Sequence, residues 1–277
     1  MRCGSSKIVT LILTCILLVG LGMLAYPTFS DWWNTSRQTR AVASYEALIE
    51  EADNDELAAS KARAIEYNEH LADTGNVWVL SDKRKADYES QLVVEGSDIM
   101  GYVEVPSIGC TLPIYHGTDE AVLQIGAGHI EGSSLPVGGT SAHSVLSGHR
   151  GLPSAKLFTD LDKLVEGDGF VLRILGETLH YEVDQILVVE PHEVEPLKIV
   201  EGEDYCTLVT CTPYSVNTHR LLVRGHRVAE TGDASAIVAA DAIMIDADIV
   251  ATCIAAPLLA ILFVVAMTTG GKGRTRR

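Results

Sequence analysis

The chain has 277 residues, a formal net charge of −16, and hydrophobic side chains at 47% of its positions. This acidic balance argues against nucleic acid as a partner, because binding to phosphates needs basic patches. All 37 acidic residues lie between Asp31 and Asp248, whereas the two ends carry only basic charges. The acidic middle part therefore favours a soluble, self-repelling surface.

Two uncharged apolar segments flank the acidic part, at residues Ile8–Leu24 and Ile249–Met267. Each is close to the ~20 residues that a helix needs to cross a bilayer. Basic residues flank the outer end of each segment, so both ends are expected in the cytoplasm and the part between them outside. The first segment also resembles a signal peptide, but its apolar core is long and AYPTF is a poor cleavage site. We predict an uncleaved anchor here and a stop-transfer anchor near the C-terminus.

The segment from Asp31 to about Ala72 has the pattern of a helical extension. It lacks Pro and Gly, and its apolar residues recur at spacings of three and four. Trp32 and Trp33 follow the first anchor, as expected for an aromatic belt at a membrane surface. The next residues, 76–99, are mixed and polar. They contain one large aromatic side chain other than tyrosine, Trp78.

From Ile99 onward, short strand-like runs alternate with Gly, Pro and Asp, which is typical of an all-β barrel or sandwich. The predicted strands are Tyr102–Val105, Thr111–Tyr115, His143–Ser147, Phe170–Ile174, Leu179–Val189, Tyr205–Thr210 and Arg220–His226. One helix is predicted over residues 151–167, from an early proline, a stripe of leucines and a final glycine: Pro153, Leu157, Leu161, Leu164 and Gly167. The roughly 130 residues up to Val228 suffice for one compact domain.

Three cysteines lie between the anchors: Cys110, Cys206 and Cys211. An odd number of cysteines in an exported domain indicates a free thiol. A bond between Cys206 and Cys211 within one strand is excluded, because five strand residues span ~16 Å and a disulfide needs Cα atoms within about 7 Å. Cys206 and Cys110 are expected in the core. For Cys211, core packing and a nucleophilic role both remain open.

Cys211 ends one predicted strand and Arg220 begins the next, so a hairpin would bring them to one rim. A nearby cation favours the reactive thiolate, and arginine can donate hydrogen bonds to a developing oxyanion. Such a site also needs a histidine to move the proton. The residues alone leave three candidates open: His143, His149 and His219.

Three stretches resemble the sortases, membrane-anchored transpeptidases of Gram-positive bacteria. TLVTCTPYSVNTHRLLVRGHR resembles their active-site signature, SVLSGHRGLPSAKLF their histidine region, and YVEVPSIGCTLPIYHGT the strand pair before it. The resemblance runs from about Met100 to Arg227 and is closest to class C, the pilin-polymerising sortases. It implies a closed eight-stranded β-barrel with short helices. It also implies Cys211 as nucleophile, His149 as general acid/base and Arg220 as stabiliser of the oxyanion, with no metal or cofactor.

The reaction implied by this resemblance is transpeptidation. The thiolate of Cys211 attacks the Thr–Gly bond of an LPXTG-type sorting signal, and the resulting thioester passes to an amine. A pilin lysine is the expected acceptor. A cell-wall precursor amine would make the chain a housekeeping sortase for surface proteins, and water would make it a membrane-tethered cysteine endopeptidase. A non-enzymatic adhesion module is a further alternative.

Class C relatives usually carry a lid with an Asp-Pro-aromatic motif over the active site. The matching residues here are Asn76-Val77-Trp78, which keep the aromatic ring but lack the carboxylate and the proline. We expect Trp78 to cover Cys211 in the resting enzyme. Thr210, directly before the nucleophile, is a candidate for substrate binding through its hydroxyl or backbone N–H.

The predicted organisation places the catalytic barrel outside the cell membrane, in contact with the bilayer only through its anchors. The expected segments are a cytoplasmic tail and anchor (1–27), a helical and lid-like extension (28–98), the barrel (99–230), a linker (231–248), a second transmembrane helix (249–268) and a basic cytoplasmic tail (269–277).

Overall fold

The structure, a computed structural model, describes residues 3–229 apart from Ser215, with side chains from Ile12 onward. The predicted linker, second anchor and basic tail over residues 231–277 lie outside the described residues. The chain divides into two compact units. The described part of the first unit ends at Trp32, and the second unit spans Trp33–Asp241.

The N-terminal helix α1 covers Cys3–Glu51 and continues through Pro27. Within the described residues, the part of α1 from Ile12 to Glu51 is the one helical segment long and apolar enough to cross a membrane, and its most apolar 18 residues have a mean hydropathy of 2.0. Its length and composition therefore agree with the anchor that the sequence predicts at this end.

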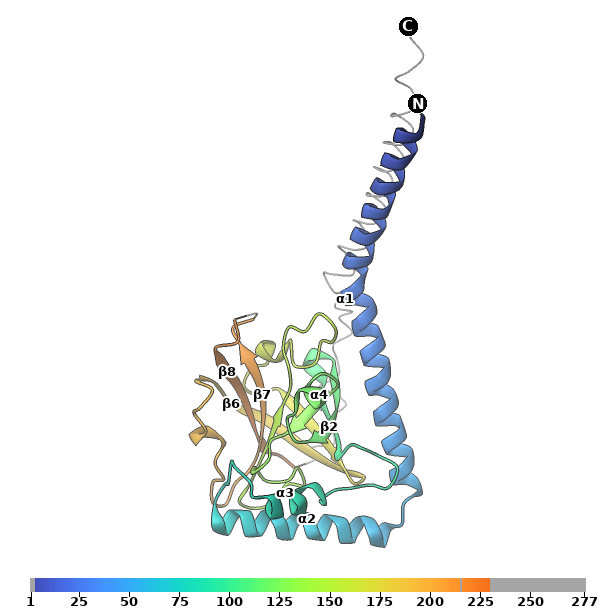
Figure 1. The fold of residues 1–277 in the computed structure, drawn as a ribbon. Helices are drawn as coiled ribbons and strands as arrows, with labels where there is room; N and C mark the ends of the chain where they lie inside the picture. Colours follow the sequence, from blue (N-terminus) through green and yellow to red (C-terminus); the bar gives the residue numbers. More distant parts are fainter. Residues whose placement is uncertain (1–2, 215, 230–277) are drawn as a thin grey trace. The chain divides into compact units, whose positions relative to one another are not determined.

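Eight strands close into a barrel in the order β1-β2-β3-β4-β7-β8-β6-β5, and β5 returns to pair with β1 (Figure 1). β2 pairs with β3 and β4 with β7 in parallel, while the other neighbours are antiparallel. The strands are β1 (Gly101–Val105), β2 (Cys110–His116), β3 (Ala127–His129), β4 (Ala142–Ser147), β5 (Gly169–Ile174), β6 (Glu177–Val189), β7 (Asp204–Thr212) and β8 (His219–Arg227). The predicted closed barrel is confirmed, and each predicted strand is present. Only the three-residue β3 was not predicted.

Short helical elements connect these strands and precede them. They are α2 (Asn54–Thr74), α3 (Asp82–Glu89), α4 (Glu120–Leu123) and the 3-10 turns η1 (Pro106–Ile108), η2 (Leu161–Lys163) and η3 (Glu195–Leu197). The predicted helical extension is broken before α2, where the Asp53 side chain accepts a hydrogen bond from the Asp55 N–H at 2.9 Å. Such an N-cap satisfies one of the free N–H groups of a helix start, and it begins a new helix here.

The strand period of two sorts the side chains of the barrel into an inner and an outer face. On β7, Cys206 and Leu208 lie in the main core, whereas Val209 belongs to a separate buried cluster. On β8, Val223 is in the main core and Leu222 in the separate cluster. The separate cluster therefore lies on the outer face of the barrel. Cys211 shares this face, since it is two residues beyond Val209.

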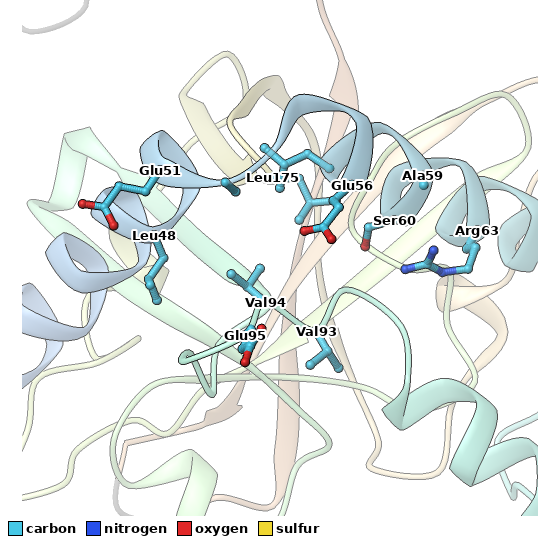
Figure 2. Close-up of a pocket in the computed structure, with 12 residues that line it drawn as sticks. Leu48, Glu51, Glu56, Ala59, Ser60, Arg63, Val93, Val94, Glu95 and Leu175 are labelled. Carbon is cyan, nitrogen blue, oxygen red and sulfur yellow. The ribbon is translucent and has the colours of Figure 1, made fainter.

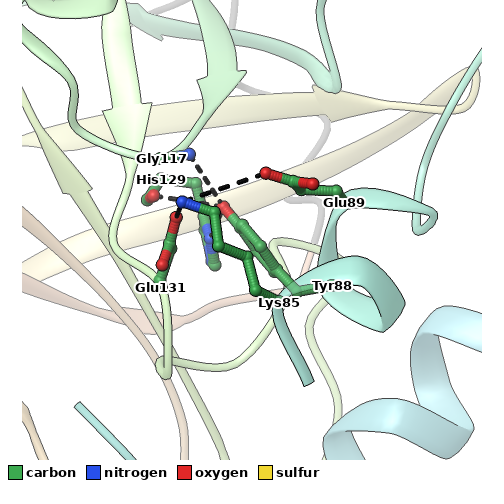
Figure 3. A network of polar contacts seen from close by, with 6 residues as sticks. All are labelled: Lys85, Tyr88, Glu89, Gly117, His129 and Glu131. Atoms are coloured by element: carbon green, nitrogen blue, oxygen red, sulfur yellow. Dashed lines mark hydrogen bonds and ion pairs between the residues drawn. The ribbon is translucent and has the colours of Figure 1, made fainter. Parts of the chain in front are cut away.

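Helices α2 and α3 lie at one end of the barrel in Figure 1. A polar network ties α3 to the strands (Figure 3). The Tyr88 hydroxyl lies 3.0 Å from Nδ1 of the buried His129 and accepts a hydrogen bond from the Gly117 N–H at 3.0 Å. Nearby, Lys85 pairs with Glu131 at 3.2 Å. These contacts fix the segment that follows Trp78.

The helix predicted over residues 151–167 is wrong. This segment is a loop with a single 3-10 turn, η2. The three leucines of the predicted stripe, Leu157, Leu161 and Leu164, are at most 4% exposed. They are buried as expected, but turns rather than a helix direct them into the core. The backbone at Gly151 and at Leu157 has positive φ values of 71° and 43°. A right-handed helix does not accommodate these dihedral angles.

Candidate active site

β7 and β8 carry two of the predicted site residues at one rim of the barrel. The strands are antiparallel, and Cys211 lies directly opposite Arg220. Directly opposed residues have Cβ atoms about 4.5–5.5 Å apart and point to the same face. The predicted alternation is confirmed, because Val209 pairs with Leu222 in the same register. The structure therefore brings Cys211 and Arg220 together.

His149 reaches this rim from β4, the parallel neighbour of β7. The last pair in the register joins Ser147 to Val209. His149 and Cys211 each follow two residues later, so they lie at the same level along these parallel neighbours, His149 just beyond β4 and Cys211 near the end of β7. Between them, the Gly148 N–H donates to the Val209 carbonyl at 3.0 Å. The turn that carries His149 is therefore bonded to the strand that carries Cys211.

Further contacts hold this turn in place. Thr210 is buried on the face opposite Cys211, and its hydroxyl donates to the Gly148 carbonyl at 2.8 Å. The His149 carbonyl accepts a hydrogen bond from the Phe158 N–H at 3.1 Å. The Phe158 ring packs on Gly148 so closely that a Cβ at that position would lie 2.5 Å from a ring carbon. The tight packing requires glycine beside His149.

The guanidinium of Arg220 is directed at backbone carbonyls of its own hairpin. It donates to the carbonyls of Asn217 at 3.3 Å and His219 at 3.1 Å. The Arg220 side chain is partly exposed. Because arginine has five donors, it can bond an incoming substrate carbonyl without losing its charge.

The imidazole of His149 faces a residue that the sequence did not single out. Its Nε2 lies 3.4 Å from Oε2 of Glu120, the first residue of α4. The Glu120 carboxylate also accepts a hydrogen bond from the Gln124 side chain at 3.0 Å. The bond from Gln124 and, after it, the neighbouring imidazole lower the pKa of Glu120. Glu120 is separated from His149 by 29 residues, so neither motif nor spacing pointed to it.

The other two thiols of this region are held away from such chemistry by burial. Burial raises the pKa of the Cys110 thiol to about 12 and that of Cys206 well above its ordinary range. Both cysteines are free, as is Cys211, so the expected absence of a Cys206–Cys211 disulfide is confirmed. Among these three, Cys211 is the thiol at the rim, where it is partly exposed.

The competing histidine of β4, His143, is a buried structural residue. Its Nδ1 lies 2.9 Å from the Lys198 carbonyl and its Nε2 lies 2.7 Å from the Thr207 hydroxyl. Burial lowers the pKa of His143 to about 4. The third candidate, His219, pairs with Thr212 in the register and is exposed.

Trp78 lies on the outer cluster, the buried group formed by Val145, Leu197, Val209 and Leu222. It is partly buried there, together with side chains from β6 and from the segment after β3. This position is on the face that carries Cys211. The ring therefore covers apolar surface that leads toward the predicted nucleophile.

Asn76 and Val77 hold the segment before Trp78 against two loops. The Asn76 side chain donates to the Gly132 carbonyl at 3.1 Å and accepts from the Ile199 N–H at 3.0 Å. The Val77 carbonyl lies so close to Gly132 that a Cβ there would be 2.1 Å away. The uncharged Asn76 side chain thus holds this segment by hydrogen bonds, at a place where the Asp-Pro-aromatic lid motif is absent.

Two cavities in the described part of the chain lie away from this rim. One cavity has a volume of about 480 Å³ and is lined by the end of α1, by α2, by residues 93–95 and by Leu175. Figure 2 shows the residues that line it. A second cavity of about 470 Å³ lies between α2, α3 and the Trp78 segment. Neither contains Cys211, His149 or Arg220. The chemistry of these three residues therefore defines the candidate site better than cavity size does.

A thiol, an imidazole and a guanidinium at one rim of a closed barrel can supply the nucleophile, the proton transfer and the oxyanion donors of covalent acyl transfer. The profile of the Sortase domain family matches residues 103–228. The fold is similar to the crystal structure of sortase C1 from Streptococcus agalactiae, with 52% identity, 69% of this chain and all of that chain covered, and a TM-score of 0.68. It is also similar to sortase C from Streptococcus pneumoniae, with 44% identity, 69% and 97% coverage, and a TM-score of 0.63.

Sortase D of Bacillus subtilis is a further relative, 29% identical over 149 residues, which are 53% of this chain and 70% of that protein. The chain belongs to the sortase family. It is therefore a cysteine transpeptidase by family, and class C sortases are among its structural neighbours.

Proposed function

We propose that the chain is a class C sortase that cleaves an LPXTG-type signal between Thr and Gly and transfers the product to a pilin lysine. The observation that carries this proposal is the pairing of Cys211 with Arg220 across β7 and β8, beside the turn of His149. The substrate class is supported by the pneumococcal sortase C, whose structure is described in terms of pilin substrate specificity.

In the proposed first step, the Cys211 thiolate attacks the carbonyl carbon of the threonine. The Arg220 guanidinium donates hydrogen bonds to the carbonyl oxygen as it gains negative charge. The C–N bond to glycine then breaks, and His149 gives its proton to the departing amine. A thioester between Cys211 and the threonine remains. For this, guanidinium donors that now bond the Asn217 and His219 carbonyls would turn to the substrate oxygen.

In the second step, the amine of a lysine attacks the thioester carbonyl carbon. His149 takes the proton from the attacking nitrogen, the C–S bond breaks, and the thiolate of Cys211 is restored. The product is an isopeptide bond between the two proteins. Transfer to an amine rather than to water distinguishes this transpeptidase from an endopeptidase.

We further propose that Trp78 acts as a lid over the substrate surface. The outer cluster beneath it is made of valine and leucine side chains on the face of Cys211. Apolar side chains of this kind suit the leucine and proline of a sorting signal. A substrate would have to displace Trp78 to reach them. Thr210 would then assist through its backbone, since its hydroxyl already bonds the Gly148 carbonyl.

The membrane arrangement remains a proposal built on the sequence and on the apolar part of α1. The barrel, residues 99–230, would lie outside the membrane between the N-terminal anchor in residues 1–27 and a second anchor at residues 249–268. The helical and lid-like extension, residues 28–98, would place it at the surface, with the linker 231–248 and the basic tail 269–277 completing the chain.

Product analysis tests the proposed function. The purified protein is incubated with an LPXTG peptide and either a lysine-containing pilin peptide or a cell-wall-type glycine amine. A peptide joined to the pilin lysine, absent in Cys211→Ala, is the expected result. Transfer to the glycine amine alone would favour the housekeeping sortase, and hydrolysis alone would favour the endopeptidase.

A further inference from the structure

The contact between Glu120 and His149 joins two segments that are far apart in the chain. Nε2 of His149 lies 3.4 Å from Oε2 of Glu120. The side chain of His149 is 24% exposed and that of Glu120 is 70% exposed, so the contact lies at the protein surface. Within the described residues, it is the one polar contact of the His149 ring.

The carboxylate of Glu120 is held in place from its other side. Its Oε1 accepts a hydrogen bond from Nε2 of Gln124, one helical turn later, at 3.0 Å. The residue after Gln124, Ile125, accepts a hydrogen bond through its carbonyl from the buried Gln38 side chain at 3.1 Å. The end of α4 is thus tied to α1, which limits the positions that Glu120 can take.

The other charged groups around the imidazole have partners elsewhere or different roles. Arg150, next to His149 in the chain, forms an ion pair with Asp162. Arg220 is directed at the carbonyls of its own hairpin. The exposed His219 contacts the Thr218 hydroxyl through Nδ1, and the Tyr214 ring lies against the guanidinium of Arg150. Cys211 is the proposed nucleophile. Glu120 is therefore the carboxylate that faces the ring.

We propose that Glu120 is a positioning residue for His149 that orients the imidazole and fixes its tautomer during acyl transfer. A carboxylate offers only acceptors, so Nε2 of His149 must carry the hydrogen in this contact. This leaves Nδ1 to take the proton of the thiol and pass it to the departing amine. The inference rests on the proposed acid/base role of His149 and adds a residue that sets its tautomer.

The test compares Glu120→Gln with the parent and with the control Asp119→Asn. The glutamine keeps the size of the side chain and removes its charge. Asp119 is the neighbouring carboxylate and forms no capping hydrogen bond with the helix start. Because the pair is exposed, we expect a roughly two- to fivefold fall in kcat/KM for transpeptidation in Glu120→Gln, with KM little changed. The difference should shrink in 1 M salt, where the Debye length is about 3 Å.

The split between kcat and KM separates positioning from a general structural effect. In Glu120→Gln, the fall should lie in kcat, while Asp119→Asn keeps the parent kcat and KM. A Glu120→Gln enzyme with the parent kcat overturns the proposal, and so does an equal fall of kcat in Asp119→Asn.

A second readout does not depend on turnover. In Cys211→Ala protein, nitrogen NMR of the neutral His149 ring should show the hydrogen mainly on Nε2, and this preference should weaken when Glu120 is also replaced by Ala. An unchanged preference overturns the inference. Failure of the proposed function would look different. In that case the NMR change would be present, while the parent enzyme would form no product that depends on Cys211.

Discussion

Gly148→Ala is the perturbation that most directly probes how the barrel holds His149. A Cβ at this position would lie 2.5 Å from Cδ2 and 3.0 Å from Cγ of Phe158, whereas ordinary contacts are 3.4–4 Å. The ring must therefore move by roughly 1 Å, and Phe158 is fully buried with its N–H bonded to the His149 carbonyl. Overpacking of this kind costs about 1–3 kcal/mol. The displacement reaches His149 directly, so activity should fall by about 100-fold.

Urea unfolding and initial rates of peptide transfer measure the two effects of Gly148→Ala. Phe158→Leu provides the matched test, because a smaller side chain makes room for the added methyl group. The double variant should recover part of both the stability and the rate that Gly148→Ala loses. Parent-like stability and rate in Gly148→Ala would refute the reasoning, as would a double variant that simply adds the losses of the two single variants.

Two further predictions concern the lid and the buried histidines. Asn76→Ala, which removes two hydrogen bonds of the lid segment, and Trp78→Ala should both speed alkylation of Cys211 by a thiol reagent; an unchanged rate in both would contradict the lid proposal. Burial lowers the pKa of His129 and of His143 from 6.5 to about 4. The unfolded chain therefore binds more protons between these values, so stability should fall as pH drops from about 6.5 to 4. Urea midpoints should fall less over this range in His129→Gln than in the parent, and an equal fall would count against the assignment.

The strands were predictable because short strand-like runs alternate with Gly, Pro and Asp along the chain. On β5 the alternating burial of a strand is also visible, since Phe170, Leu172 and Ile174 are buried while the residues between them are partly exposed. The period of two correctly predicted that Cys211 and Arg220 share a face, once the two strands were taken as a hairpin. Local sequence pattern was thus sufficient for most of the strands and for the pairing of Cys211 with Arg220.

Contacts that form only when the barrel closes could not be predicted from local sequence patterns. The contact of Glu120 with His149 forms because β3 and β4 follow α4 and bring the chain back to the same rim. The leucines at 157, 161 and 164 had helical spacing, yet a loop with positive φ at Leu157 buries them. Spacing reports which side chains are buried, but loops and helices can bury the same set. The anchoring of Asn76 by two distant loops was likewise invisible in the sequence.

Mass spectrometry of the acyl-enzyme tests the central claim most directly. The protein is mixed with an LPXTG peptide in the absence of an amine acceptor, quenched in acid and digested. The account predicts an added mass equal to the peptide up to its threonine, located on the fragment that contains Cys211, and its loss when a lysine amine is added. An adduct that persists in Cys211→Ala, or a parent and a Trp78→Ala variant that both form no adduct, would contradict it.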